Sequence, residues 1–112
     1  MSLFRGKDDL ERRRAPRFTP DAAVCCQILD PRNGRSWPAA IRDISLTGIA
    51  LLVARRFEEG ELLTIELRHN NGVARKHLVE VRQSDICCPN DAFLHGCRFA
   101  RPLRGEELRE ML

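Results

Sequence analysis

The stretch Glu61-Leu62-Leu63-Thr64-Ile65-Glu66-Leu67-Arg68 alternates apolar and polar side chains with a period of two from Leu63 onward. Leu63, Ile65 and Leu67 share one face, and the polar Thr64, Glu66 and Arg68 lie on the other, as in a strand with one buried face. Asn70-Asn71-Gly72 follows, and this sequence is typical of a tight hairpin turn. The stretch therefore predicts the first strand of a β-hairpin and, with it, an antiparallel sheet.

Similar strand-like segments, separated by turn residues, lie on both sides of this hairpin. The predicted strands span residues 23–30, 36–44, 48–53, 61–68, 73–83 and 92–100. Pro38 cannot donate to a ladder, so we expect an edge or a bulge near the start of its strand. His95 shares a face with Cys97 and Phe99, which favours a packed histidine over a ligand.

Residues 102–112 predict a short amphipathic helix. Acidic residues fill its first turn, and Leu108, Met111 and Leu112 form one apolar side. A helix this short is not stable alone in water, so we expect it to dock on the sheet or on a partner. That partner could be a second copy of the chain in a homodimer. Six short antiparallel strands with an appended helix indicate an all-β fold, a small closed barrel, because closure removes exposed edge strands.

A chain of 112 residues with 43% hydrophobic and 31% charged residues is typical of one globular domain. No apolar run reaches the length of a transmembrane helix, so we expect no membrane partner. The N-terminus lacks the apolar core of a secretory signal, which favours the cytoplasm.

The positive charge of the chain is concentrated in residues 1–17, which carry six basic and three acidic side chains. The other residues carry thirteen of each, so this segment accounts for the whole net charge of +3. This distribution favours a small, local anionic partner over an extended nucleic-acid surface, although a solvated basic tail is the alternative. We expect residues 1–10 to be a flexible, disordered arm ahead of a domain at 11–112.

Neither the cysteines nor any catalytic motif predicts an active centre. The five cysteines are an odd number with no metal-binding spacing, which favours structural thiols over disulfides, a metal or a redox site. Glycine-rich phosphate loops, nucleophile elbows and zinc-protease motifs are absent from the sequence. We therefore expect a protein that is not an enzyme and needs no cofactor.

Two polar stretches remain, the arginine cluster at 11–18 and the segment from Asp43 to Gly48. An arginine fork can donate two hydrogen bonds to a phosphate or to the O6/N7 edge of guanine. A carboxylate such as Asp43 can accept from the N1–H and N2–H₂ groups of guanine. The two stretches together form a chemically sensible guanine clamp, while a serine turn that caps a strand corner is the alternative for the second stretch.

These stretches resemble the motifs of the PilZ domain family. Arg13-x-x-x-Arg17 is similar to its Arg-x-x-x-Arg motif, and Asp43-x-Ser45-x-x-Gly48 to its Asp/Asn-x-Ser-x-x-Gly motif. Phe57-x-x-Gly60 and Gly96-x-x-Phe99 resemble two further family positions, and the resemblance covers residues 11–112.

The resemblance implies a bacterial domain with a six-stranded antiparallel split barrel that binds the second messenger cyclic di-GMP. The ligand-binding residues that it implies are Arg12, Arg13, Arg17, Asp43, Ser45, Gly48 and Gly96. An arginine at position 12 in such proteins favours an intercalated ligand dimer over a single molecule. Ordering of the arm on binding would then present a surface to a downstream protein partner whose identity the sequence does not give.

Two other classes compete with this reading. A sequence-independent RNA- or DNA-binding barrel would need exposed aromatic side chains, yet the chain has no tyrosine and one tryptophan, Trp37. An interaction module that no longer binds nucleotide would have lost its motif residues, and here they are intact.

Overall fold

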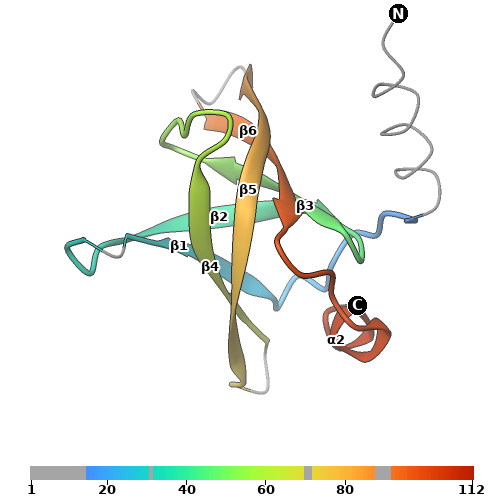
Figure 1. Cartoon of the computed structure of the whole chain (residues 1–112). Coiled ribbons are helices and arrows are strands. Elements are labelled where there is room, and N and C mark those ends of the chain that lie inside the picture. The colour runs from blue at the N-terminus through green and yellow to red at the C-terminus, as the bar shows by residue number, and fades with distance from the viewer. Residues whose placement is uncertain (1–14, 31, 70–71, 88–91) are drawn as a thin grey trace, which may run out of the picture.

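The computed structural model describes residues 15–30, 32–69, 72–87 and 92–112, which contain six strands and a short helix (Figure 1). These elements are β1 (Cys25–Leu29), β2 (Ser36–Ile44), β3 (Gly48–Val53), β4 (Leu62–Arg68), β5 (Ala74–Cys87), β6 (Ala92–Phe99) and α2 (Gly105–Glu110). The order of the strands around the sheet is β1-β2-β3-β6-β5-β4, and β4 pairs with β1 to close a barrel. The predicted six-stranded antiparallel barrel with a C-terminal helix is confirmed.

Closure of the barrel changes two expectations about individual strands. Pro38 lies opposite Gln27 in a regular register between β1 and β2, so the edge or bulge predicted there is wrong. The register shifts of the barrel fall at Arg42 in β2 and at Arg82 in β5 instead. β5 also runs on past Gln83, because β6 offers backbone partners to its last residues.

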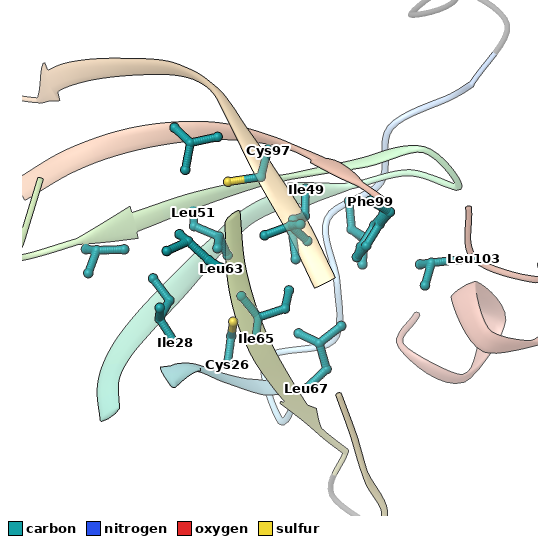
Figure 2. Close-up of a cluster of buried hydrophobic side chains, with 14 of the residues drawn as sticks. Cys26, Ile28, Ile49, Leu51, Leu63, Ile65, Leu67, Cys97, Phe99 and Leu103 are labelled. Carbon is teal, nitrogen blue, oxygen red and sulfur yellow. The ribbon is translucent and has the colours of Figure 1, made fainter. Parts of the chain in front are cut away.

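The barrel interior is filled by alternate side chains of all six strands, and Figure 2 shows many of them converging. The predicted face of β4 is buried, with Leu63, Ile65 and Leu67 at most 7% exposed. Burial of this apolar surface, at about 25 cal/mol per Å², is the main favourable contribution to the stability of the fold.

Helix α2 covers one end of the barrel through Leu103, Leu108 and Met111, which are buried in the same core (Figure 1). Leu112 was expected to join them, but it lies beyond the end of the helix and is 46% exposed. Two backbone hydrogen bonds fix the segment: the Leu103 N–H donates to Leu46, and the Met111 carbonyl accepts from Asp21. Within the described ranges, no helix is long and apolar enough to cross a bilayer.

Candidate ligand-binding site on the barrel wall

Arg17 is brought to the barrel by a short backbone bridge just after it. Phe18 and Ile44 exchange two N–H···O hydrogen bonds of 2.8 Å, which pair the segment before β1 with the end of β2. The guanidinium of Arg17 forms an ion pair with the carboxylate of Asp43. Their side chains are 40% and 28% exposed, so both partners can be reached from solvent.

The turn between β2 and β3 is organised by Ser45. Its N–H donates to the Gly48 carbonyl at 2.8 Å, and its Oγ accepts from the Gly48 N–H at 3.0 Å and the Thr47 N–H at 3.3 Å. Strand alternation through Asp43, Ile44 and Ser45 would place Ser45 on the same side as Asp43, but Ser45 is 1% exposed and does not lie beside it on the surface. Strand alternation ends at Ile44, and the hydroxyl instead satisfies the turn, as the serine-turn alternative predicts. Direct contact of Ser45 with a ligand stays a prediction.

Gly48 is required by close packing. Its φ lies outside the left-handed region, but a Cβ atom here would lie 2.8 Å from the Cys97 carbonyl oxygen of β6. The same Cβ would lie 3.5 Å from Nη2 of Arg17, so the guanidinium is placed over this glycine. The turn thus holds β3 close to β6 and leaves room for Arg17 above it.

Four residues from four neighbouring strands form one row on the outer wall of the barrel. The row runs Asp43 (β2), Ala50 (β3), Gly96 (β6) and Gln83 (β5), each paired with the next. A Cβ on Gly96 would meet only the Cβ of Gln83, at 3.7 Å, which places these two residues on the same face. The adjoining row is fully interior and consists of Ile44, Ile49, Cys97 and Val81.

The two ends of the outer row depend on the two bulges. Asp43 pairs with Ala50 only because β2 has an extra residue at Arg42, and Gln83 pairs with Gly96 only because β5 has one at Arg82. A one-residue shift of a strand moves its side chains to the opposite face. Each bulge therefore turns outward a residue that a regular strand would direct into the core.

The remaining predicted site residues, Arg12 and Arg13, lie outside the described residues, so their positions stay predictions. The structure brings Arg17, Asp43 and Gly48 together, and Gly96 lies on the same wall. Gln83 was not predicted to belong to this wall. Its sequence context carries no signal of a bulge, because bulges are defined by the partner strand.

The ionisable groups of the barrel interior are neutral, although Nδ1 of the buried His95 has no hydrogen-bond partner among the described residues. Burial raises the pKa of both Cys26 and Cys97 to about 12, so these are thiols at ordinary pH, and Cys25, Cys26 and Cys97 are free of disulfides. His95 is 1% exposed, as predicted for a packed histidine, and its Nε2 accepts from the Phe57 N–H at 3.0 Å. Burial lowers the pKa of His95, which keeps it neutral and able to accept. Within the described residues, no group of three potential ligands could hold a metal ion.

Two hollows lie beside α2, away from the arginine–carboxylate pair. One of about 130 Å³ lies between Leu67, His69 and Met111, and an open one of about 720 Å³ follows β5 and residues 101–104. Both are lined by basic and acidic side chains together, which gives neither a clear preference for an anion. Arg17 and Asp43 lie instead on an open wall.

The structure is a closed six-stranded barrel in which an arginine of the N-terminal segment pairs with a carboxylate at the end of β2. These features define a class of small β-barrel domains with a polar site on the outer wall. The family model described as PilZ domain matches residues 11–112. The chain belongs to the PilZ domain family.

Solved structures share the fold. The inhibitor of motility MotI/DgrA of Bacillus subtilis matches with a TM-score of 0.65 and 21% identity over 89% of this chain and 48% of its own. YcgR of Escherichia coli in complex with c-di-GMP matches with a TM-score of 0.66 and 19% identity, over 89% of this chain and 42% of its own. The MrkH–c-di-GMP complex of K. pneumonia matches with a TM-score of 0.65 and 23% identity, over 89% and 49%.

The chain therefore spans less than half the length of each of these three proteins. No curated protein sequence matches it significantly.

Proposed function

We propose that the chain is a non-catalytic receptor domain for cyclic di-GMP. The observation that carries the proposal is the Arg17–Asp43 pair over Gly48, which assembles parts of both family motifs on one wall of a PilZ barrel. The structures of YcgR and MrkH that share this fold are complexes with the same nucleotide.

The chemistry of the site fits a guanine nucleotide that carries phosphate groups. Asp43 can accept from the N1–H and N2–H₂ groups of guanine, and the forks of Arg13 and Arg17 can donate to O6/N7 or to phosphate oxygens. Gly48 and Gly96 keep the wall low enough for a flat base to approach. Ser45 contributes at least by holding the turn in shape.

The N-terminal segment supplies the regulatory part of the proposal. Arginines clustered at positions 12 to 14 repel one another until a partner with phosphate charges neutralises them. Binding would order this segment against the wall and present a new surface to a downstream protein. Arg12 would contact a second ligand molecule and thereby favour an intercalated dimer of cyclic di-GMP.

The packing of Trp37 favours this receptor role over RNA binding, whereas Phe18, at 39% exposed, is the described aromatic side chain that would be free to stack. Trp37 is half-buried, packs edge-on against Phe57 with ring centroids 5.8 Å apart, and carries the Arg55 guanidinium 4.5 Å above its ring. It is therefore not a free platform for stacking bases.

Isothermal titration of the purified chain with cyclic di-GMP, with GTP and single-stranded RNA as controls, tests the function. We expect saturable binding of cyclic di-GMP only. Absence of that binding would contradict the proposal, and binding of RNA alone would support the nucleic-acid alternative. Hydrogen–deuterium exchange of peptides that cover residues 5–17 tests the ordering of the arm, which should slow their exchange when cyclic di-GMP is added.

A further inference from the structure

We propose that Gln83 is a ligand-contacting residue that marks the far side of the nucleotide site, opposite Arg17 and Asp43. This inference rests on the proposed function, since it assigns a further residue to the same site. Gln83 belongs to none of the family motifs in the sequence, and it reaches this wall through the fold of β5 alone.

The matched pair of bulges is the first observation. β2 and β5 are not neighbours in the barrel, yet each is irregular at the residue before the one that ends the outer row. Without its bulge, β5 would place Arg82 opposite Gly96 and turn Gln83 toward the interior. Two separate irregularities thus direct Asp43 and Gln83 to the same wall, and bulges often re-aim side chains beside functional sites.

The space between the two ends is the second observation. Only Ala50 and Gly96 lie between Asp43 and Gln83, so the middle of the row carries no side chain larger than a methyl group. Ala50 is 9% exposed, so the side chains around it extend farther from the barrel than its methyl group does. Three spacings between strands, followed along the curved outer surface of the closed barrel, separate the ends by about 14 Å, a path wide enough for one nucleobase with a hydrogen-bonding side chain at each end.

The chemistry of Gln83 is the third observation. Its side chain is exposed, and its Nε2 donates to Oδ2 of Asp85 at 3.0 Å. Asp85 therefore holds the carboxamide in place, while the second N–H and the oxygen remain available for other partners. A carboxamide both donates and accepts, which suits a purine edge, where ring nitrogens accept and exocyclic amines donate.

The chain offers a matched control, because Gln27 is its other glutamine. Gln27 is also exposed, and it lies on β1, which is separated from β6 and β5 in the barrel order. Titration of cyclic di-GMP into the wild type, Gln83→Ala and Gln27→Ala tests the inference. We expect Gln83→Ala to weaken binding about three- to tenfold, the loss of one hydrogen bond, and Gln27→Ala to bind as the wild type does. Thermal denaturation should give the same midpoint for all three.

The side-chain NH₂ signals of the two glutamines give a second readout in nitrogen–proton correlation spectra. Each signal is assigned by its disappearance in the corresponding variant. Cyclic di-GMP should shift the Gln83 signal and leave that of Gln27 in place. If the wild type binds and Gln83→Ala binds equally well, the inference is overturned while the receptor function stands. If the wild type does not bind, the receptor function fails and the inference fails with it.

Discussion

Arg17 and Asp43 form an ion pair that joins the segment before β1 to the end of β2, 26 positions away in the sequence. Because both side chains are partly exposed, water and salt screen the attraction, and such pairs contribute at most about 1 kcal/mol to folding. The pair therefore positions two polar groups more than it stabilises the barrel. A dianionic ligand could therefore pair with Arg17 in place of Asp43, and the loss of the ion pair would cost the fold little stability.

Replacement of Arg17 by alanine separates binding from folding. We expect the affinity for cyclic di-GMP to fall by about 2 kcal/mol or more, roughly 30-fold, through loss of a charge-assisted contact. The free energy of unfolding in urea should change by less than about 1 kcal/mol. Arg68→Ala is the control, since Arg68 also pairs with a carboxylate, Glu66, but on β4. Wild-type affinity in Arg17→Ala contradicts the assignment.

The two glycines of the wall should respond differently to alanine. In Gly48→Ala the new methyl group meets the Cys97 carbonyl oxygen at 2.8 Å, so we expect a loss of about 1–3 kcal/mol in the free energy of unfolding. In Gly96→Ala it meets only an ordinary contact at 3.7 Å, so the fold should be as stable as the wild type or slightly more stable. Chemical denaturation measures both variants.

Ligand affinity adds a second comparison between the same two variants. If a base lies on the row, Gly96→Ala should weaken cyclic di-GMP binding although the fold is intact. A Gly96→Ala variant that is stable and binds normally would remove Gly96 from the site.

Stability should decrease as the solution becomes acidic, because of His95. Burial lowers its pKa in the folded state, with Arg56 lowering it further, while the unfolded chain protonates near the usual value of 6.5. The unfolded state therefore binds more protons below pH 6.5, and the free energy of unfolding falls from there downward. His95→Gln, which keeps an acceptor for the Phe57 N–H but does not titrate, should show a shallower dependence in denaturant titrations between pH 7.5 and 5.5.

Part of this pH dependence should remain in His95→Gln, since burial also lowers the pKa of His77. Identical slopes for the wild type and His95→Gln would show that the buried imidazole does not contribute.

Arg12 should set the number of ligands. We expect calorimetry to give two molecules of cyclic di-GMP per chain for the wild type and one for Arg12→Leu, because the guanidinium at this position would pair with or stack on the second molecule. A stoichiometry of one in the wild type, or no change in the variant, contradicts this role.

The strands were predictable because their signals are local. The alternation along residues 61–68 is an intrinsic property of the chain, and the structure buries its apolar face. β2 and β3 form with the predicted bounds, since turn residues limit them on both sides. The closed barrel follows from six such strands that must pair their edges.

The register and the fine geometry of the site were not predictable, because they depend on partner strands. The bulges at Arg42 and Arg82 are visible only against β3 and β6, and without them the outward position of Gln83 cannot be deduced. The need for Gly48 comes from a carbonyl oxygen almost fifty positions later in the chain. The burial of Ser45 likewise comes from hydrogen bonds that form only when the turn closes.

Helix α2 is tethered on both sides by backbone hydrogen bonds. The Leu103 N–H, before its N-terminus, donates to Leu46 of the β2–β3 turn, and the Met111 carbonyl, at its C-terminus, accepts from Asp21 of the N-terminal segment. A displacement of either support must move the helix or break a hydrogen bond. With each bond contributing about 1 kcal/mol, mechanical coupling between the outer wall of the barrel and the helix is limited to a few kcal/mol, which is the usual range of allosteric coupling.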